Sequence, residues 1–224
     1  MRRNRKFGKP KLYGILKTEL YKIEGCEEAS NFDRCLDYEK FVEVVTELFN
    51  KVVELKEQYR RKTLEVWSSY LALTIIMLAN GLRIREALRA IIEFYETGER
   101  EFTIKAEKGG DVRIVKIPEF IEREDVEHIC KELIRHGEKR VKDRVEAWLK
   151  EVFGVNPHSI RYAFIRYYYV LGGKPLEVIA RGLGLKKTRT ITEYYLRGLQ
   201  LEDEEEVVEG GGVERDSQGS YGMG

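Results

Sequence analysis

The stretch Asn156-Pro-His158-Ser-Ile-Arg161-Tyr-Ala-Phe-Ile-Arg166 predicts the start of a helix that carries two polar groups. Pro157 suits the first turn, because the N–H that proline lacks would have no helical partner there. His158 and Arg161 are three residues apart and therefore project from one face of the helix. Since a helix N-terminus also presents unpaired backbone N–H groups, this combination predicts a site for an anion such as a phosphate.

Two further motifs precede this helix. The first, Gly81-Leu-Arg83-Ile-Arg-Glu86, follows a strongly apolar helical pattern and begins another helix. Arg83 and Glu86 could form an ordinary surface ion pair there, or they could lie on the floor of a cleft. The second motif is a Lys108-Gly-Gly turn between residues 101–106 and 112–117, which are rich in β-branched residues and predict a β-hairpin.

In this order, Gly-Leu-Arg-x-x-Glu, a hairpin with a lysine in its turn, His-x-x-Arg and the segment Thr192-Glu-Tyr194-Tyr195 resemble the tyrosine recombinases, which include the phage-type integrases. The resemblance covers about residues 40 to 198. It implies the catalytic-domain fold of that family, which is mainly α-helical with a small β-hairpin and therefore of the α+β class. His-x-x-Arg alone is weak evidence, because that pair often only caps and solvates a helix.

The resemblance implies a site-specific DNA recombinase or integrase that cleaves and rejoins DNA through a 3′-phosphotyrosyl intermediate, without a metal ion, ATP or another cofactor. Arg83 and Arg161 would bind the phosphate, and Glu86 would support the site. Lys108, rather than its neighbours Lys105 and Lys116, would protonate the departing 5′ oxygen, and His158 would assist proton transfer. The implied nucleophile is Tyr195, with Tyr194 as the alternative.

Charge divides the chain into three regions. Residues 1–35 form a basic, mostly irregular arm, residues 36–199 the region that resembles the catalytic domain, and residues 200–224 an acidic, glycine-rich tail. The tail has a net charge of −7, which leaves +8 on residues 1–199 although the whole chain carries only +1. The tail is too poor in apolar residues to fold. The arm predicts a DNA-backbone contact, with a solubilising tail as the alternative. The DNA-binding candidates are Arg2, Arg3, Arg5, Lys6, Lys186 and Lys187.

Two departures from the family pattern leave other functions open. Leu185 stands where most members have a histidine or tryptophan that binds the phosphate, so either this donor is missing or Lys186 or Lys187 replaces it. The stretch before Arg83 is also too short for the helical clamp domain of the family; the arm, another chain or a longer protein could supply it. The alternatives are a type IB topoisomerase and a DNA-binding protein that keeps the fold but has lost the reaction.

The expected partner is double-stranded DNA, bound by a homo-oligomer that forms a tetramer on DNA and can exchange C-terminal helices. The resemblance points to an archaeal, viral or mobile-element protein, and 35% charged residues with few glutamines lean towards a thermophile. Three cysteines without a Cys-x-x-Cys pair predict an intracellular chain without a zinc site. No signal peptide is evident and the apolar run at 71–79 is too short to span a bilayer, so we expect a cytoplasmic protein with no membrane partner.

Overall fold

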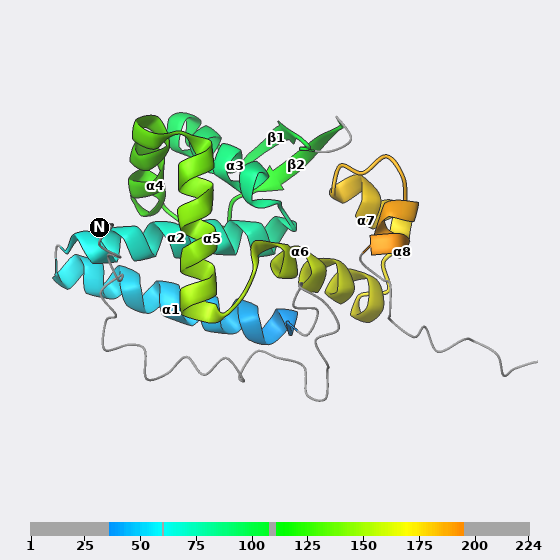
Figure 1. Ribbon diagram of the computed structural model, residues 1–224, viewed down its shortest axis with the longest axis horizontal. Coiled ribbons are helices and arrows are strands. Elements are labelled where there is room, and N and C mark those ends of the chain that lie inside the picture. The colour runs from blue at the N-terminus through cyan, green and yellow to red at the C-terminus, as the bar shows by residue number, and fades with distance from the viewer. Residues whose placement is uncertain (1–35, 60, 108–110, 195–224) are drawn as a thin grey trace, which may run out of the picture.

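The computed structural model describes residues 36–59, 61–107 and 111–194, with the backbone alone for Val170, Thr190, Glu193 and Tyr194. The described chain is mostly helical with one two-stranded antiparallel sheet, which confirms the expected α+β class (Figure 1). In order, the elements are α1 (Tyr38–Gln58), α2 (Lys62–Asn80), α3 (Ile84–Thr97), β1 (Glu101–Lys105), β2 (Val112–Lys116), α4 (Arg123–His136), α5 (Glu138–Phe153), α6 (Pro157–Arg166), the π-helix η3 (Tyr167–Leu171), α7 (Leu176–Gly182) and α8 (Arg189–Tyr194).

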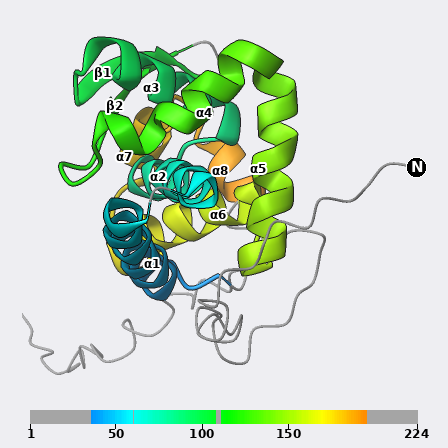
Figure 2. The ribbon, with the colours of Figure 1, turned by 90° about the vertical axis from the view of Figure 1, so that its left-hand side faces the viewer.

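Helix α2 is the centre of the fold. It is apolar on nearly all sides, and Figure 2, which looks along it, shows it surrounded by the other helices. By length and composition α2 could cross a membrane, which differs from the expectation based on the shorter run at 71–79. However, 78% of its apolar window is buried inside the protein, as is usual for a core helix. The helix ends at Gly81, which adopts a left-handed conformation.

The surrounding helices bury one face each. In α1, the side chain of Asp37 accepts a hydrogen bond from the backbone N–H of Lys40 and so caps the helix. Trp148 of α5 packs edge to face against Trp67 and Tyr70 of α2, with ring centroids 5.4 Å apart in both pairs. These contacts close the core around α2.

The β-hairpin is attached to the C-terminal end of α2. Its strands pair in a regular register, with Thr103 opposite Ile114. Asn80 forms two hydrogen bonds with Lys116: its amide nitrogen donates to the Lys116 carbonyl and its side-chain oxygen accepts from the Lys116 N–H, both at 2.9 Å. This pair of hydrogen bonds to the Lys116 backbone fixes the hairpin beside the turn at Gly81.

The C-terminal elements form a smaller core of their own. Asn156 caps α6 by accepting a hydrogen bond from the His158 N–H at 2.9 Å, and Pro157 occupies the first turn, as predicted. Helix α6 continues into η3, a π-helical turn that the local sequence pattern does not predict. Helices α7 and α8 lie beyond the end of α6, and α7 contacts β2 (Figure 1). Ile165 of α6 packs there with Ile179, Leu183 and Ile191.

Candidate anion-binding site around Glu86

The turn at Gly81 brings α2, α3 and α6 together. Gly81 has φ of +59°, and a Cβ atom there would lie 2.5 Å from the ring of Phe164 on α6. A glycine is therefore required both for the backbone conformation and for the close approach of α6. The Gly81 carbonyl accepts a hydrogen bond of 2.6 Å from Nη1 of Arg161, which lies 80 residues away in the sequence.

The carboxylate of Glu86, in the first turn of α3, is the hub of the site. It is fully buried and accepts hydrogen bonds from the backbone N–H of Arg83 at 3.0 Å, from Nη1 of Arg83 at 3.1 Å and from the backbone N–H of Glu107 at 3.0 Å. The pair of Arg83 and Glu86 is thus a buried one, and the alternative of a surface ion pair is wrong. Glu107 directly follows β1 and Ala106, so Glu86 also holds the beginning of the hairpin turn.

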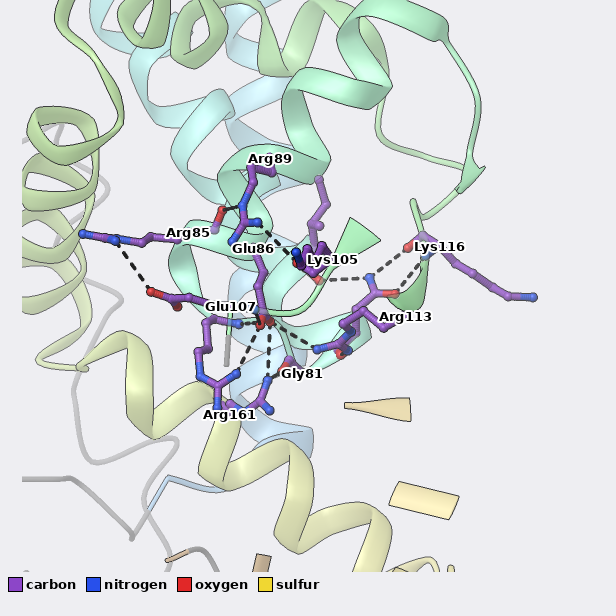
Figure 3. A network of polar contacts seen from close by, with 12 residues as sticks. Gly81, Arg85, Glu86, Arg89, Lys105, Glu107, Arg113, Lys116 and Arg161 are labelled. Carbon is purple, nitrogen blue, oxygen red and sulfur yellow. Dashed lines mark hydrogen bonds and ion pairs between the residues drawn. The ribbon is translucent and has the colours of Figure 1, made fainter. Parts of the chain in front are cut away.

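Two more arginines converge on the same carboxylate (Figure 3). Nη1 of Arg161 lies 3.6 Å from Oε2 of Glu86, and Nη1 of Arg113 on β2 lies 3.3 Å from the same oxygen. Arg113 also donates through Nη2 to the carbonyl of Asn80. Arg83, Arg113 and Arg161 together carry three positive charges against one carboxylate, so the buried cluster has a net charge of about +2.

The protonation of these groups follows from their surroundings. Burial alone raises the pKa of Glu86, but the hydrogen bond from the Glu107 N–H, the charges of Arg161 and Arg113, and the Arg83 N–H together hold it below its ordinary value. Glu86 is therefore ionised at neutral pH. Burial, reinforced by repulsion from Arg161, lowers the pKa of Arg113 to about 10. Arg113 thus remains charged at neutral pH as well.

The structure brings three of the predicted site residues together: Arg83, Glu86 and Arg161. Arg161 is fully buried, whereas Arg83 remains 9% exposed. His158 lies on the same helix as Arg161, one turn closer to its N-terminus, and is partly buried with its ring edge-on to Tyr162. The roles of these side chains in catalysis stay predictions.

Other predicted site residues lie outside the described part of the chain. They are Lys108, Tyr195, the side chain of the alternative nucleophile Tyr194, and the arm residues Arg2, Arg3, Arg5 and Lys6. In the sequence, Lys108 directly follows Glu107, whose backbone N–H donates to Glu86. Tyr195 follows the last residue of α8.

Lys186 and Lys187 do not contact Glu86. Both are exposed, and Nζ of Lys186 lies 3.9 Å from Oδ1 of Asp111, at the far end of the hairpin turn. The adjacent Gly184 packs so tightly on the hairpin that a Cβ there would lie 2.8 Å from Cβ of Ala106. The lysine segment therefore lies beside Ala106 and Asp111, which flank the hairpin turn in the sequence. Its part as a replacement phosphate donor stays a prediction.

Arg113 is the member of the cluster that sequence reasoning missed. The signal was present in the alternation of β2: Arg113 shares its phase with Val115 and Ile117, which are buried, whereas Val112 and Ile114 are exposed. A charged residue in the inward phase of a strand needs a buried partner. Here that partner is Glu86.

Comparison with known proteins links the chain to a viral protein. It is 32% identical over 143 residues to a protein named "Putative integrase ORF241" from the Acidianus two-tailed virus. The chain is similar to a viral protein that carries an integrase name. The match covers 64% of this chain, which spans 58% of the length of that relative.

A second relative comes from an archaeon. The chain is 29% identical over 199 residues to an uncharacterized protein of Methanocaldococcus jannaschii, covering 75% of this chain and 85% of that protein. No protein-family model matches the chain, and no solved structure matches it. Of these two relatives, the viral one bears an integrase name, and neither name specifies a tyrosine-type enzyme.

Proposed function

We propose that this protein is a DNA integrase or recombinase of the tyrosine type. The observation that carries the proposal is the meeting of Arg83 and Arg161 on one buried carboxylate, although they belong to different elements far apart in the sequence. If His158 and Arg161 only capped and solvated a helix at the surface, Arg161 would not need to lie next to Arg83 and Glu86. The integrase name of the viral relative supports the same reading.

The cluster suits a backbone phosphate. Glu86 compensates one of the three guanidinium charges and orients all three groups, so the excess positive charge is held in place before an anion arrives. Guanidinium groups bind phosphate oxygens with paired, charge-assisted hydrogen bonds. Because Arg83 is partly exposed and Arg161 is fully buried, an incoming phosphate meets Arg83 first, and contact with Arg161 requires a conformational change.

In the proposed reaction, the hydroxyl oxygen of Tyr195 attacks the phosphorus of a DNA phosphodiester and gives up its proton, with His158 assisting the transfer. The new Tyr–phosphorus bond forms as the bond from phosphorus to the 5′ oxygen breaks. Lys108 donates a proton to that oxygen, so a 5′ hydroxyl leaves and a 3′-phosphotyrosyl link remains. Rejoining reverses these steps, and the covalent link conserves the energy of the phosphodiester.

Covalent trapping tests this proposal. A library of random duplexes, each nicked a few bases from one end so that the short cleaved fragment diffuses away, is incubated with the protein. We expect a protein–DNA adduct that resists denaturation. Tyr195→Phe should abolish it, because the phenyl ring has no nucleophilic oxygen, whereas the matched variant Tyr194→Phe should retain it. Loss of the adduct only in Tyr194→Phe would assign the nucleophile to Tyr194.

A DNA-binding protein without the reaction is the second candidate, and the complete burial of Arg161 together with Leu185 in place of the usual donor favours it. Loss of one such donor typically costs about 100-fold to 1,000-fold in rate. Binding of duplex DNA without any adduct would support this candidate. Relaxation of supercoiled plasmid without strand exchange would instead indicate a topoisomerase. We also propose that the active assembly is a homo-oligomer on double-stranded DNA.

A further inference from the structure

A cationic groove is lined by Arg113 but not by Glu86. It has a volume of about 410 Å³ and is formed by the end of α2, β2, α6, η3 and α7. The cations along it are Arg113, Lys116 and Lys174, and its lining contains no carboxylate. Arg113 is buried, and its Nε atom has no hydrogen-bond partner among the described residues. The groove is therefore a place where an acidic group would gain interactions.

Part of the groove's exposed lining is apolar. Ile114 of β2 and Val178 of α7 line it and are more than half exposed, at 56% and 53%. Both lysines of the groove already have contacts: Lys116 pairs with Glu101 at the surface, and Nζ of Lys174 lies 4.5 Å from the centre of the Tyr168 ring. An occupant that combines carboxylates with aliphatic side chains would complement both the charge and the apolar part of the lining.

We propose that the acidic segment Glu202–Glu209 of the same chain occupies this groove and thereby restrains the binding of DNA. The segment reads Glu-Asp-Glu-Glu-Glu-Val-Val-Glu, so two adjacent valines stand among six acids. The valines match the exposed aliphatic part of the lining, and the acids match the cationic part. The charge segregation of the chain, −7 on the tail against +8 on the rest, favours such an association within the molecule.

The segment can reach the groove. Helix α8 ends at Tyr194, and its Ile191 packs in the same small core as Ile179, which also lines the groove. Seven residues separate Tyr194 from Glu202, and an extended chain of that length spans about 25 Å. This exceeds the diameter of a single helix, which is about 10 Å. The connecting segment is therefore long enough to pass across one helix.

A peptide-binding experiment tests this proposal without DNA. The probe is a fluorescent peptide of residues 201–210, added at low ionic strength to two full-length proteins: the natural chain and a tail-neutral variant with Glu202→Gln, Asp203→Asn, Glu204→Gln, Glu205→Gln, Glu206→Gln and Glu209→Gln. We expect the tail-neutral variant to bind the peptide about tenfold or more tightly than the natural chain, whose own tail already occupies the groove. Equal binding by both proteins would overturn the proposal.

A second comparison locates the binding site. In the tail-neutral background, Lys174→Glu with Val178→Asp should weaken peptide binding about tenfold or more, because like charges then face each other. The matched control, Lys139→Glu with Ile134→Asp, makes the same change in charge at exposed residues of α5 and α4 and should leave peptide binding unchanged. Equal losses in both double variants would overturn the proposal, as would equally tight binding of a peptide with the same residues in scrambled order.

The proposed restraint of DNA binding by the tail rests on the proposed function, and it is tested separately by measuring DNA affinity. The tail-neutral variant should bind duplex DNA more tightly than the natural chain at low salt, and added peptide should compete with DNA on that variant. If the peptide binds in the groove but neither protein binds DNA, the proposed function fails while the tail contact stands. If both proteins bind DNA with equal affinity, the regulatory role is wrong.

Discussion

At the scale of single residues, Glu86 links more parts of the candidate site than any other residue discussed above. Its carboxylate caps the start of α3, holds the hairpin turn through Glu107 and orders Arg83, Arg113 and Arg161. Because all three guanidinium groups are largely buried, removing the one carboxylate leaves their charges facing one another. Glu86 is thus a structural requirement of the fold as well as part of the candidate site.

Glu86→Gln should therefore lower the free energy of unfolding by about 3–5 kcal/mol at neutral pH. The folded-state pKa of Glu86 is lowered, so its contribution is present above the ordinary value of 4.5 and is lost as pH falls through the folded-state pKa. The difference between the natural chain and the variant should shrink towards acid pH. Urea unfolding between pH 7 and pH 3 measures it.

Glu119→Gln is the control for this experiment. Glu119 pairs with Arg100 at 3.4 Å, but its side chain is 89% exposed, so the substitution should have little effect at any pH. A destabilisation by Glu86→Gln that stays constant down to pH 3 would show that the carboxylate charge is not what stabilises the cluster.

At the scale of elements, the turn between α2 and α3 determines where α6 lies. Gly81 combines a positive φ with direct contact to Phe164, and its carbonyl binds Arg161. The same turn precedes Arg83, so the distance between the two site arginines depends on how closely α6 packs against it. A side chain at position 81 should disturb both the fold and the site.

Gly81→Ala should destabilise the protein by about 3 kcal/mol, of which about 1 kcal/mol comes from the positive φ and about 2 kcal/mol from overlap with the Phe164 ring. Gly98→Ala is a matched control, because Gly98 also has a positive φ but its Cβ would meet nothing closer than 3.8 Å. It should cost about 1 kcal/mol. Thermal and urea unfolding of both variants give the comparison, and equal losses would mean that α6 moves away without cost.

At the scale of the whole molecule, the relevant property is the separation of charge. A net +8 outside the acidic tail gives the protein a field that attracts a polyanion, and the arm concentrates cations at one end of the sequence. If the protein binds DNA as proposed, phosphate contacts should dominate the affinity and make it depend on salt. The number of such contacts made by the arm is then measurable.

Replacing Arg2, Arg3, Arg5 and Lys6 together by glutamine should reduce the slope of log affinity against log salt by about 3 to 4, since each phosphate contact contributes about 0.9. The affinity for duplex DNA, measured by fluorescence anisotropy at several salt concentrations, provides the slope. Neutralising the exposed cations Lys131, Arg135, Lys139 and Arg140 of α4 and α5 is the control and should change it little. Equal changes in both variants would indicate that the arm acts only through net charge.

Much of the fold could be predicted because its signals are local. The cap at Asp37, the proline in the first turn of α6, the apolar pattern of α2, the glycine that ends it and the alternation of the hairpin strands each depend on neighbouring residues. The resemblance of three ordered motifs also selected Arg83, Glu86 and Arg161 before their contact was known. The burial of these three side chains could not be read from their spacing.

The sequence by itself determined the elements, the division of charge and the candidate residues, because propensity, capping and periodicity act within a few positions. Only the tertiary structure decided that Arg113 joins Glu86, that Arg161 binds the Gly81 carbonyl and is fully buried, and that α6 passes into a π-helical turn. These features depend on how α2, β2 and α6 pack against one another. Such contacts join residues that no local pattern connects.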